Sequence, residues 1–122
     1  MRTPLALLLL ALVAVPAVAA ELPPVPGRVV FSTLTVAEAQ KLDGRRARFV
    51  VVLDSEAADR GGSVVYDCRS RDDTLRSVWL VAGQDVAAEM TVDAVLRLRY
   101  VPASHGFAGF WEYRLTEARR VK

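Results

Sequence analysis

Five stretches of alternating apolar and polar residues occupy most of the 122-residue chain after its first third. Alternation with a period of two is typical of β-strands that bury one face, because successive side chains point to opposite sides. The connections between the stretches are rich in Gly, Asp, Ser and Pro, which favour turns. The stretches run over residues 45–53, 63–70, 75–81, 92–100 and 111–121. They predict a mainly β domain of five strands, in which the second and third form a hairpin.

A short helix is predicted before the first strand. Thr35 and Glu38 match a capping box, in which the Thr hydroxyl and the Glu carboxylate satisfy free backbone N–H groups at a helix start. The helix then runs from Val36 to about Leu42, and Asp43-Gly44 ends it.

A second short helix is predicted between the third and fourth strands, where Asp85 is a plausible N-cap for one or two turns over 86–90. The polar stretch 54–62 and the stretch 103–109 are expected to be loops. Residues 29–31 fit either a short strand or a hydrophobic staple against the first helix.

The first twenty residues have the pattern of a secretory signal peptide. Arg2 provides a positive charge, residues 5–15 are an unbroken apolar run that Pro16 ends, and Ala17, Ala19 and Ala20 are small. The alternative is an uncleaved anchor, but the apolar run is shorter than the ~20 residues that span a bilayer.

We therefore expect residues 1–20 to be a signal peptide cleaved after Ala19 or Ala20, residues 21–34 a Pro-rich linker, and residues 35–122 the folded domain. The protein is expected to be exported, either to the periplasm or as a secreted protein, with no membrane span after cleavage. About 102 residues remain, enough for one small domain.

Charge and cysteine content narrow the function. The chain has 16 Lys and Arg against 14 Asp and Glu, and removing Arg2 leaves 15 against 14, a net charge of +1. A general polyanion binder usually has a clear basic excess.

Cys68 is the only cysteine, so no internal disulfide can form. We expect a buried thiol in a strand; the alternatives are an intermolecular disulfide and an exposed reactive thiol.

No catalytic or metal-binding motif is present in the sequence. One His and one Cys cannot supply the four ligands of a structural zinc site. The acidic residues of 54–62 lack the spacing of a calcium-binding EF-hand, and no Gly-rich phosphate loop is followed by Lys. An enzyme that uses Cys68 or His105 is a further alternative, but no recognisable nucleophile motif surrounds either residue. We expect no catalytic residues, no metal, no cofactor and no enzymatic activity.

Five strands with a short helix between the third and fourth is the element order of an OB-fold. Residues 42–49, 90–98 and 113–121 resemble the first, fourth and fifth strands of exported bacterial OB-fold domains, of the tRNA_anti-like or periplasmic OB-like kind. The resemblance covers 35–122, although Ala94 and Val95 stand where that family often has Gly. It implies a small five-stranded OB-like barrel with a short N-terminal helix and a second short helix between strands 3 and 4.

The resemblance also implies a binding groove over the second and third strands and over the loops that join strand one to two and strand four to five. Arginines beside aromatic residues there would suit stacking and pairing with anions, although strand arginines also serve simply to keep a sheet surface soluble. Trp79 and Tyr66 are expected in the core, and Arg97 and Arg99 are further candidates for the groove. The predicted ligand-binding residues are Arg46, Arg48, Arg69, Arg76, His105, Phe107, Phe110 and Trp111.

Two functions remain open. The first is a non-catalytic binding module that contacts a protein or an envelope component. The alternative is an oligonucleotide or anionic-glycan binder that uses the Arg and aromatic face. The near-neutral charge and the expected export both argue against nucleic acid as the partner.

Overall fold

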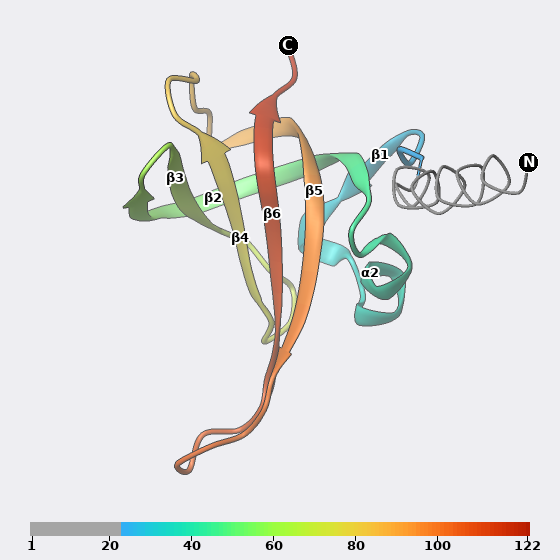
Figure 1. The fold of residues 1–122 in the computed structure, drawn as a ribbon, viewed down its shortest axis with the longest axis vertical. Helices are drawn as coiled ribbons and strands as arrows, with labels where there is room; N and C mark the ends of the chain where they lie inside the picture. The colour runs from blue at the N-terminus through green and yellow to red at the C-terminus, as the bar shows by residue number, and fades with distance from the viewer. Residues whose placement is uncertain (1–22) are drawn as a thin grey trace, which may run out of the picture.

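The computed structural model describes residues 23–122, so the predicted signal peptide lies outside the described residues. The described part is mainly β, as the alternation predicts, with six strands, one 3-10 turn and one α-helix (Figure 1). The elements are β1 (Arg28–Val30), η1 (Phe31–Thr33), α2 (Val36–Leu42), β2 (Arg46–Arg60), β3 (Ser63–Cys68), β4 (Leu75–Val81), β5 (Glu89–Val101) and β6 (Phe110–Arg120).

Five of the strands pair in a closed ring. The order is β2-β3-β4-β6-β5, and β5 pairs back to β2. All of these pairings are antiparallel except β4 with β6, which is parallel. β1 adds a short parallel pairing to β2. Each of β3 to β6 therefore has two hydrogen-bonded neighbours, and β2 has three.

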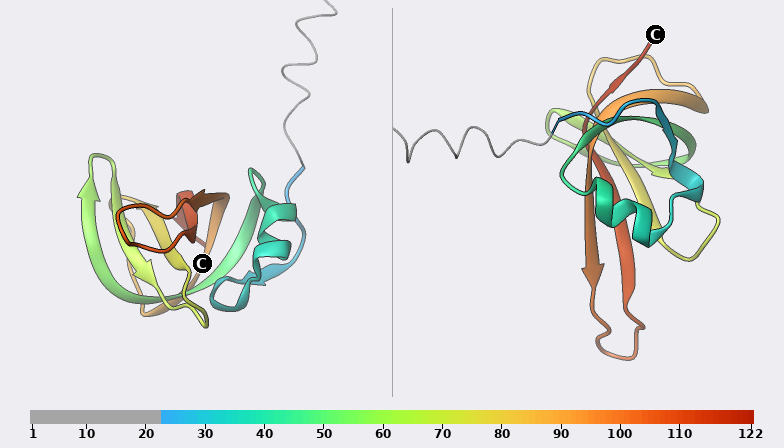
Figure 2. Two further views of the ribbon diagram at one scale, coloured as in Figure 1. Left: turned by 90° about the horizontal axis from the view of Figure 1, so that it is seen from below. Right: turned by 90° about the vertical axis from the view of Figure 1, so that its right-hand side faces the viewer.

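β2 is longer than predicted. The stretch 54–60, expected to be part of a loop, continues the strand to Arg60 and pairs with β3. The pairing shifts register between Leu53 and Ser55 and again between Glu56 and Ala58. Such bulges bend a strand and interrupt its alternation, which removes the period-two signal. β2 curves strongly as a result (Figure 2), and only the turn at Gly61-Gly62 separates it from β3.

The prediction of a helix between the third and fourth strands is wrong. Residues 84–88 connect β4 to β5 without helical structure. The Gln84 side chain organises the connection: its amide donates to the carbonyls of Val81 at 2.7 Å and Ala118 at 3.3 Å, and its oxygen accepts from the N–H of Arg120. Gln84 therefore ties the connection to β4 and β6, and Asp85 does not cap a helix.

The predicted first helix is confirmed as α2, with the expected bounds. The Thr35 hydroxyl accepts from the N–H of Glu38 at 3.2 Å, and Glu38 Oε1 accepts from the N–H of Thr35 at 3.0 Å. These hydrogen bonds with Thr35 lower the pKa of Glu38. Ala39 is buried, and α2 packs beside β5.

The segment predicted as a linker, 21–34, contains β1 and η1 within its described part. Phe31 and Leu34 belong to the hydrophobic core. The Phe31 ring packs edge-on against Phe49 and Tyr113, with ring centroids 5.9 and 6.3 Å apart. This segment therefore supplies core side chains to the ring.

Candidate functional site

The structure does not gather the eight predicted ligand-binding residues into one groove. Arg76, predicted to face outward, is only 2% exposed and points into the ring. It lies on the same side of β4 as the buried Val78 and Leu80, because side chains two apart along a strand share a face. Arg76 is therefore corrected from a surface residue to a core residue.

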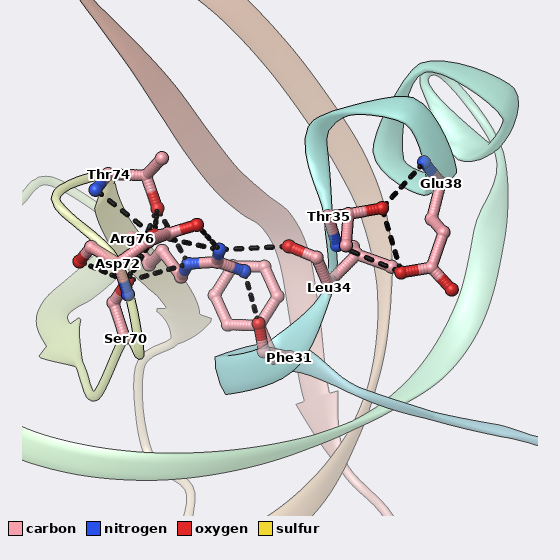
Figure 3. Close-up of polar contacts among 8 residues, drawn as sticks. All are labelled: Phe31, Leu34, Thr35, Glu38, Ser70, Asp72, Thr74 and Arg76. Carbon is pink, nitrogen blue, oxygen red and sulfur yellow. Dashed lines mark hydrogen bonds and ion pairs between the residues drawn. The ribbon is translucent and has the colours of Figure 1, made fainter.

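One side of the Arg76 guanidinium is bound by the turn that precedes β4 (Figure 3). Its Nε donates to the hydroxyls of Thr74 at 2.8 Å and Ser70 at 3.1 Å, and its Nη2 lies 3.1 Å from each carboxylate oxygen of Asp72. Desolvation acts to raise the pKa of Asp72, but hydrogen bonds from Thr74, Ser70 and Arg76 outweigh it and hold that pKa well below its usual range.

The other side of the guanidinium binds the chain before α2. Arg76 donates to the carbonyl of Leu34 at 2.8 Å and to the carbonyl of Phe31. Its centre lies 4.0 Å from the centroid of the Tyr113 ring. Arg76 thus joins β4, β6 and the segment before α2, which is a structural task rather than ligand binding.

Replacing Arg76 with Met is expected to lower the free energy of unfolding by about 3 kcal/mol, because it leaves two buried carbonyls and a carboxylate without their cation. Urea unfolding measures this. The control is Arg71→Met, at an exposed position in the same turn, for which a change within about 0.5 kcal/mol is expected. Equal losses in the two variants would contradict the role given to Arg76.

Three other predicted arginines lie apart from the projecting end of the hairpin that β5 and β6 form. Arg46 pairs with Asp93 at 2.9 Å, and it lines an open hollow of about 450 Å³ with its neighbour Arg48. Arg69 follows the end of β3, with its Nε 3.9 Å from Asp54. The structure therefore separates these arginines from the predicted aromatic residues.

The predicted aromatic residues do come together, on the hairpin formed by β5 and β6. This hairpin extends well beyond the rest of the domain (Figures 1 and 2). At its tip, Ser104 and Phe107 exchange backbone hydrogen bonds of 3.0 and 2.9 Å. His105 and Gly106 between them have φ of 50° and 83°, and positive φ at both central residues suits a two-residue hairpin turn. Phe107 is 77% exposed.

Aromatic side chains lie on both faces of the hairpin. Tyr100 opposes Trp111 with ring centroids 5.1 Å apart, on the face that continues toward the core. Val101 opposes Phe110 on the other face. Tyr100 is 49% exposed and was missed by the sequence analysis, although its place at the end of the fourth alternating stretch was visible. The Tyr100 ring also lies directly against Gly109, where a Cβ would collide with it.

Trp79 also differs from its prediction. It was expected in the core, but Val78 and Leu80 take the inward positions and Trp79 lies on the outer face, partly buried. The guanidinium of Arg114 lies 4.7 Å from its ring centroid. Tyr66, by contrast, packs against the core as expected.

Three arginines lie close together on β5 and β6 and are called here the arginine cluster: Arg97, Arg99 and Arg114, the last of which lies against Trp79. Arg99 and Arg114 both contact Glu112, at 3.0 and 2.8 Å, whereas Arg97 lies directly opposite Arg114 in the β5–β6 register. The three arginines and Glu112 line a small hollow of about 100 Å³. Three arginines against one glutamate leave the cluster with an excess of positive charge. Arg97 opposite Arg114 destabilises the strand pair there, because like charges that face each other repel.

Cys68 is buried at the end of β3, as expected. Desolvation, followed by the nearby charges of Asp54 and Asp67, raises the pKa of its thiol to about 12. His105 lies at the tip of the hairpin, whereas Cys68 belongs to the core cluster. The thiol therefore stays protonated near neutral pH and is a poor nucleophile.

A thiol reagent at pH 8 is expected to label Cys68 roughly 10³-fold more slowly in the folded protein than in urea, because the thiolate fraction falls with the raised pKa. The absorbance of released thionitrobenzoate measures both rates. Rapid labelling of the folded protein would contradict the buried assignment and restore Cys68 as a candidate nucleophile.

Within residues 23–122, no group of three or more His, Cys, Asp and Glu side chains is placed to hold a metal ion. No helix in the same range combines the length and the apolar character that crossing a bilayer requires. No protein-family model matches the chain, and no curated protein or solved structure is significantly similar to it.

Proposed function

We propose that the protein is an exported, non-catalytic binding module, and that the β5–β6 hairpin contacts a protein or an envelope component. We further propose that its domain is a small OB-like barrel. The closed pairing order, with β4 parallel to β6, and the resemblance of residues 35–122 support this assignment. In such domains the loop between the fourth and fifth strands borders the binding surface, and the hairpin between β5 and β6 occupies that position.

The observation that carries the proposal is the exposure of aromatic side chains on this hairpin. Phe107, Tyr100 and Phe110 are all exposed large apolar residues at the projecting end of this hairpin. A two-stranded ribbon has no core of its own to bury them. Exposed apolar residues gathered in one patch mark contact sites, and aromatic residues dominate the binding energy of such sites.

The raised pKa of Cys68 and its burial support the absence of catalysis, because they remove the only cysteine from the candidate nucleophiles. Binding a partner through the hairpin requires no covalent bond to form or break. The proposal therefore assigns the domain a role in holding a partner.

Photo-crosslinking in cells that export the chain tests the proposal. Benzoylphenylalanine at position 107 is expected to form specific adducts with a protein or another envelope component, because Phe107 is at the hairpin tip. The control is the same group at Val86, which is 43% exposed on the connection between β4 and β5. Adducts of equal yield at both positions, or none at position 107, would contradict the role of the hairpin.

The arginine cluster beside Trp79 favours a second candidate, a binder of oligonucleotides or anionic glycans. The net charge of +1 opposes it. We expect the chain to elute from heparin and from single-stranded DNA columns at low salt, with elution close to that of Arg97→Gln. Retention that falls steeply with salt, and that Arg97→Gln abolishes, would favour the second candidate over the first.

A further inference from the structure

The hairpin is free of charged side chains over its whole projecting length. From Tyr100 to Trp111, twelve residues in succession include no Asp, Glu, Lys or Arg, although these four types make up 25% of the chain. Both strand ends and the tip can therefore leave water without burying a formal charge.

The backbone of the hairpin is hydrogen-bonded at its base and at its tip, with residues 102–103 and 108–109 unpaired between them. β5 and β6 stay paired as far as Val101 and Phe110, and the tip is closed by the two hydrogen bonds between Ser104 and Phe107. Unpaired backbone groups keep irregular segments out of the hydrocarbon core of a bilayer, so residues 102–103 and 108–109 limit the hairpin to the hydrated headgroup layer. The tip lies five residues beyond Tyr100, or about 15 Å at the rise of a strand, which is enough to reach into a headgroup layer.

The apolar side chains surround the hairpin instead of forming one stripe. Tyr100 and Trp111 occupy one face, Val101 and Phe110 occupy the other, and Phe107 is at the tip. A groove on a protein would cover a single face of such a ribbon and leave the other in water. A lipid layer surrounds both faces, and Trp and Tyr prefer its boundary with water.

The arginine cluster lies just behind this apolar stretch, toward the body of the domain. Arg97 and Arg99 precede the stretch on β5 and Arg114 follows it on β6, with Glu112 as the carboxylate between them. These three guanidinium groups and the carboxylate lie on the same face of the hairpin as Val101 and Phe110, because positions two apart along a strand share a face. Anionic headgroups complement such a cluster.

We propose that the hairpin inserts its tip into the surface of an anionic lipid layer, with the arginine cluster against the headgroups. This inference rests on the proposed function and names the envelope component as a lipid surface. Phe107 enters deepest, Tyr100 and Trp111 lie at the boundary, and the chain binds the membrane at its surface without spanning it.

Tryptophan fluorescence gives a direct test, because the chain has only two tryptophans and neither lies in residues 1–22. In Trp79→Phe, Trp111 on the hairpin is the only tryptophan. The exported chain carrying this substitution is mixed with vesicles of phosphatidylcholine and phosphatidylglycerol at about 3:1, or of phosphatidylcholine alone. With the anionic vesicles we expect a blue shift of Trp111 emission, and an affinity at least ~10-fold higher than with the neutral vesicles.

Two matched variants separate the hairpin from the rest of the surface. Phe107→Asp is expected to remove vesicle binding and the blue shift, whereas Val86→Asp, which adds the same charge elsewhere, is expected to keep both. Arg97→Gln is expected to reduce the preference for anionic vesicles. Circular dichroism of each variant verifies that it is folded.

Absence of a Trp111 emission shift with anionic vesicles would overturn the lipid proposal. Equal affinity for the two kinds of vesicle would also overturn it, as would an equal loss of vesicle binding in Phe107→Asp and Val86→Asp. Adducts from position 107 to a protein, without any vesicle binding, would overturn it in favour of a protein partner. In that case the proposed function would stand, because a protein would then be the component that the hairpin contacts.

Discussion

The buried guanidinium of Arg76 is the interaction on which the organisation of the domain depends. A charged group costs much free energy to bury unless its donors are satisfied. Here the turn at 70–74 supplies hydroxyls and a carboxylate, the chain before α2 supplies two carbonyls, and Tyr113 supplies an aromatic face. Three segments that are distant in sequence can satisfy Arg76 only when all of them are in place.

The same β5–β6 pairing that closes the ring also builds the projecting hairpin. Leu98 and Tyr113 oppose each other at the core, and the next inward-facing pair along the strands is Tyr100 with Trp111. The hairpin is therefore a direct continuation of two strands anchored in the core, so the domain supports its exposed tip. Its inner face changes from the buried Tyr113 to the exposed Tyr100 within one pair of residues.

Capping and alternation patterns predicted the elements in which they are unbroken. They failed where a bulge interrupts the alternation, and the faces of β4 were misassigned where the type of one side chain was taken to decide its face. The capping box at Thr35 and the alternation of β4 gave correct bounds, because each depends on neighbouring residues alone. The extension of β2 was hidden by bulges, since these break the alternation. Arg76 and Trp79 were assigned to the wrong faces because charge and size were given more weight than the positions of Val78 and Leu80. The aromatic residues of the hairpin were named from the sequence, but which strands face one another around the ring was not predicted, so Arg46 and Arg69 were grouped with them.

The position of β6 between β4 and β5 has a consequence for how the chain folds. The last strand fills the gap between two earlier ones, so the ring stays open until residues 110–120 have been synthesised. Contacts between strands so far apart in sequence form late, because the intervening chain must first lose its loop entropy. Until β6 is in place, the facing edges of β4 and β5 stay unpaired and open to pairing with another chain.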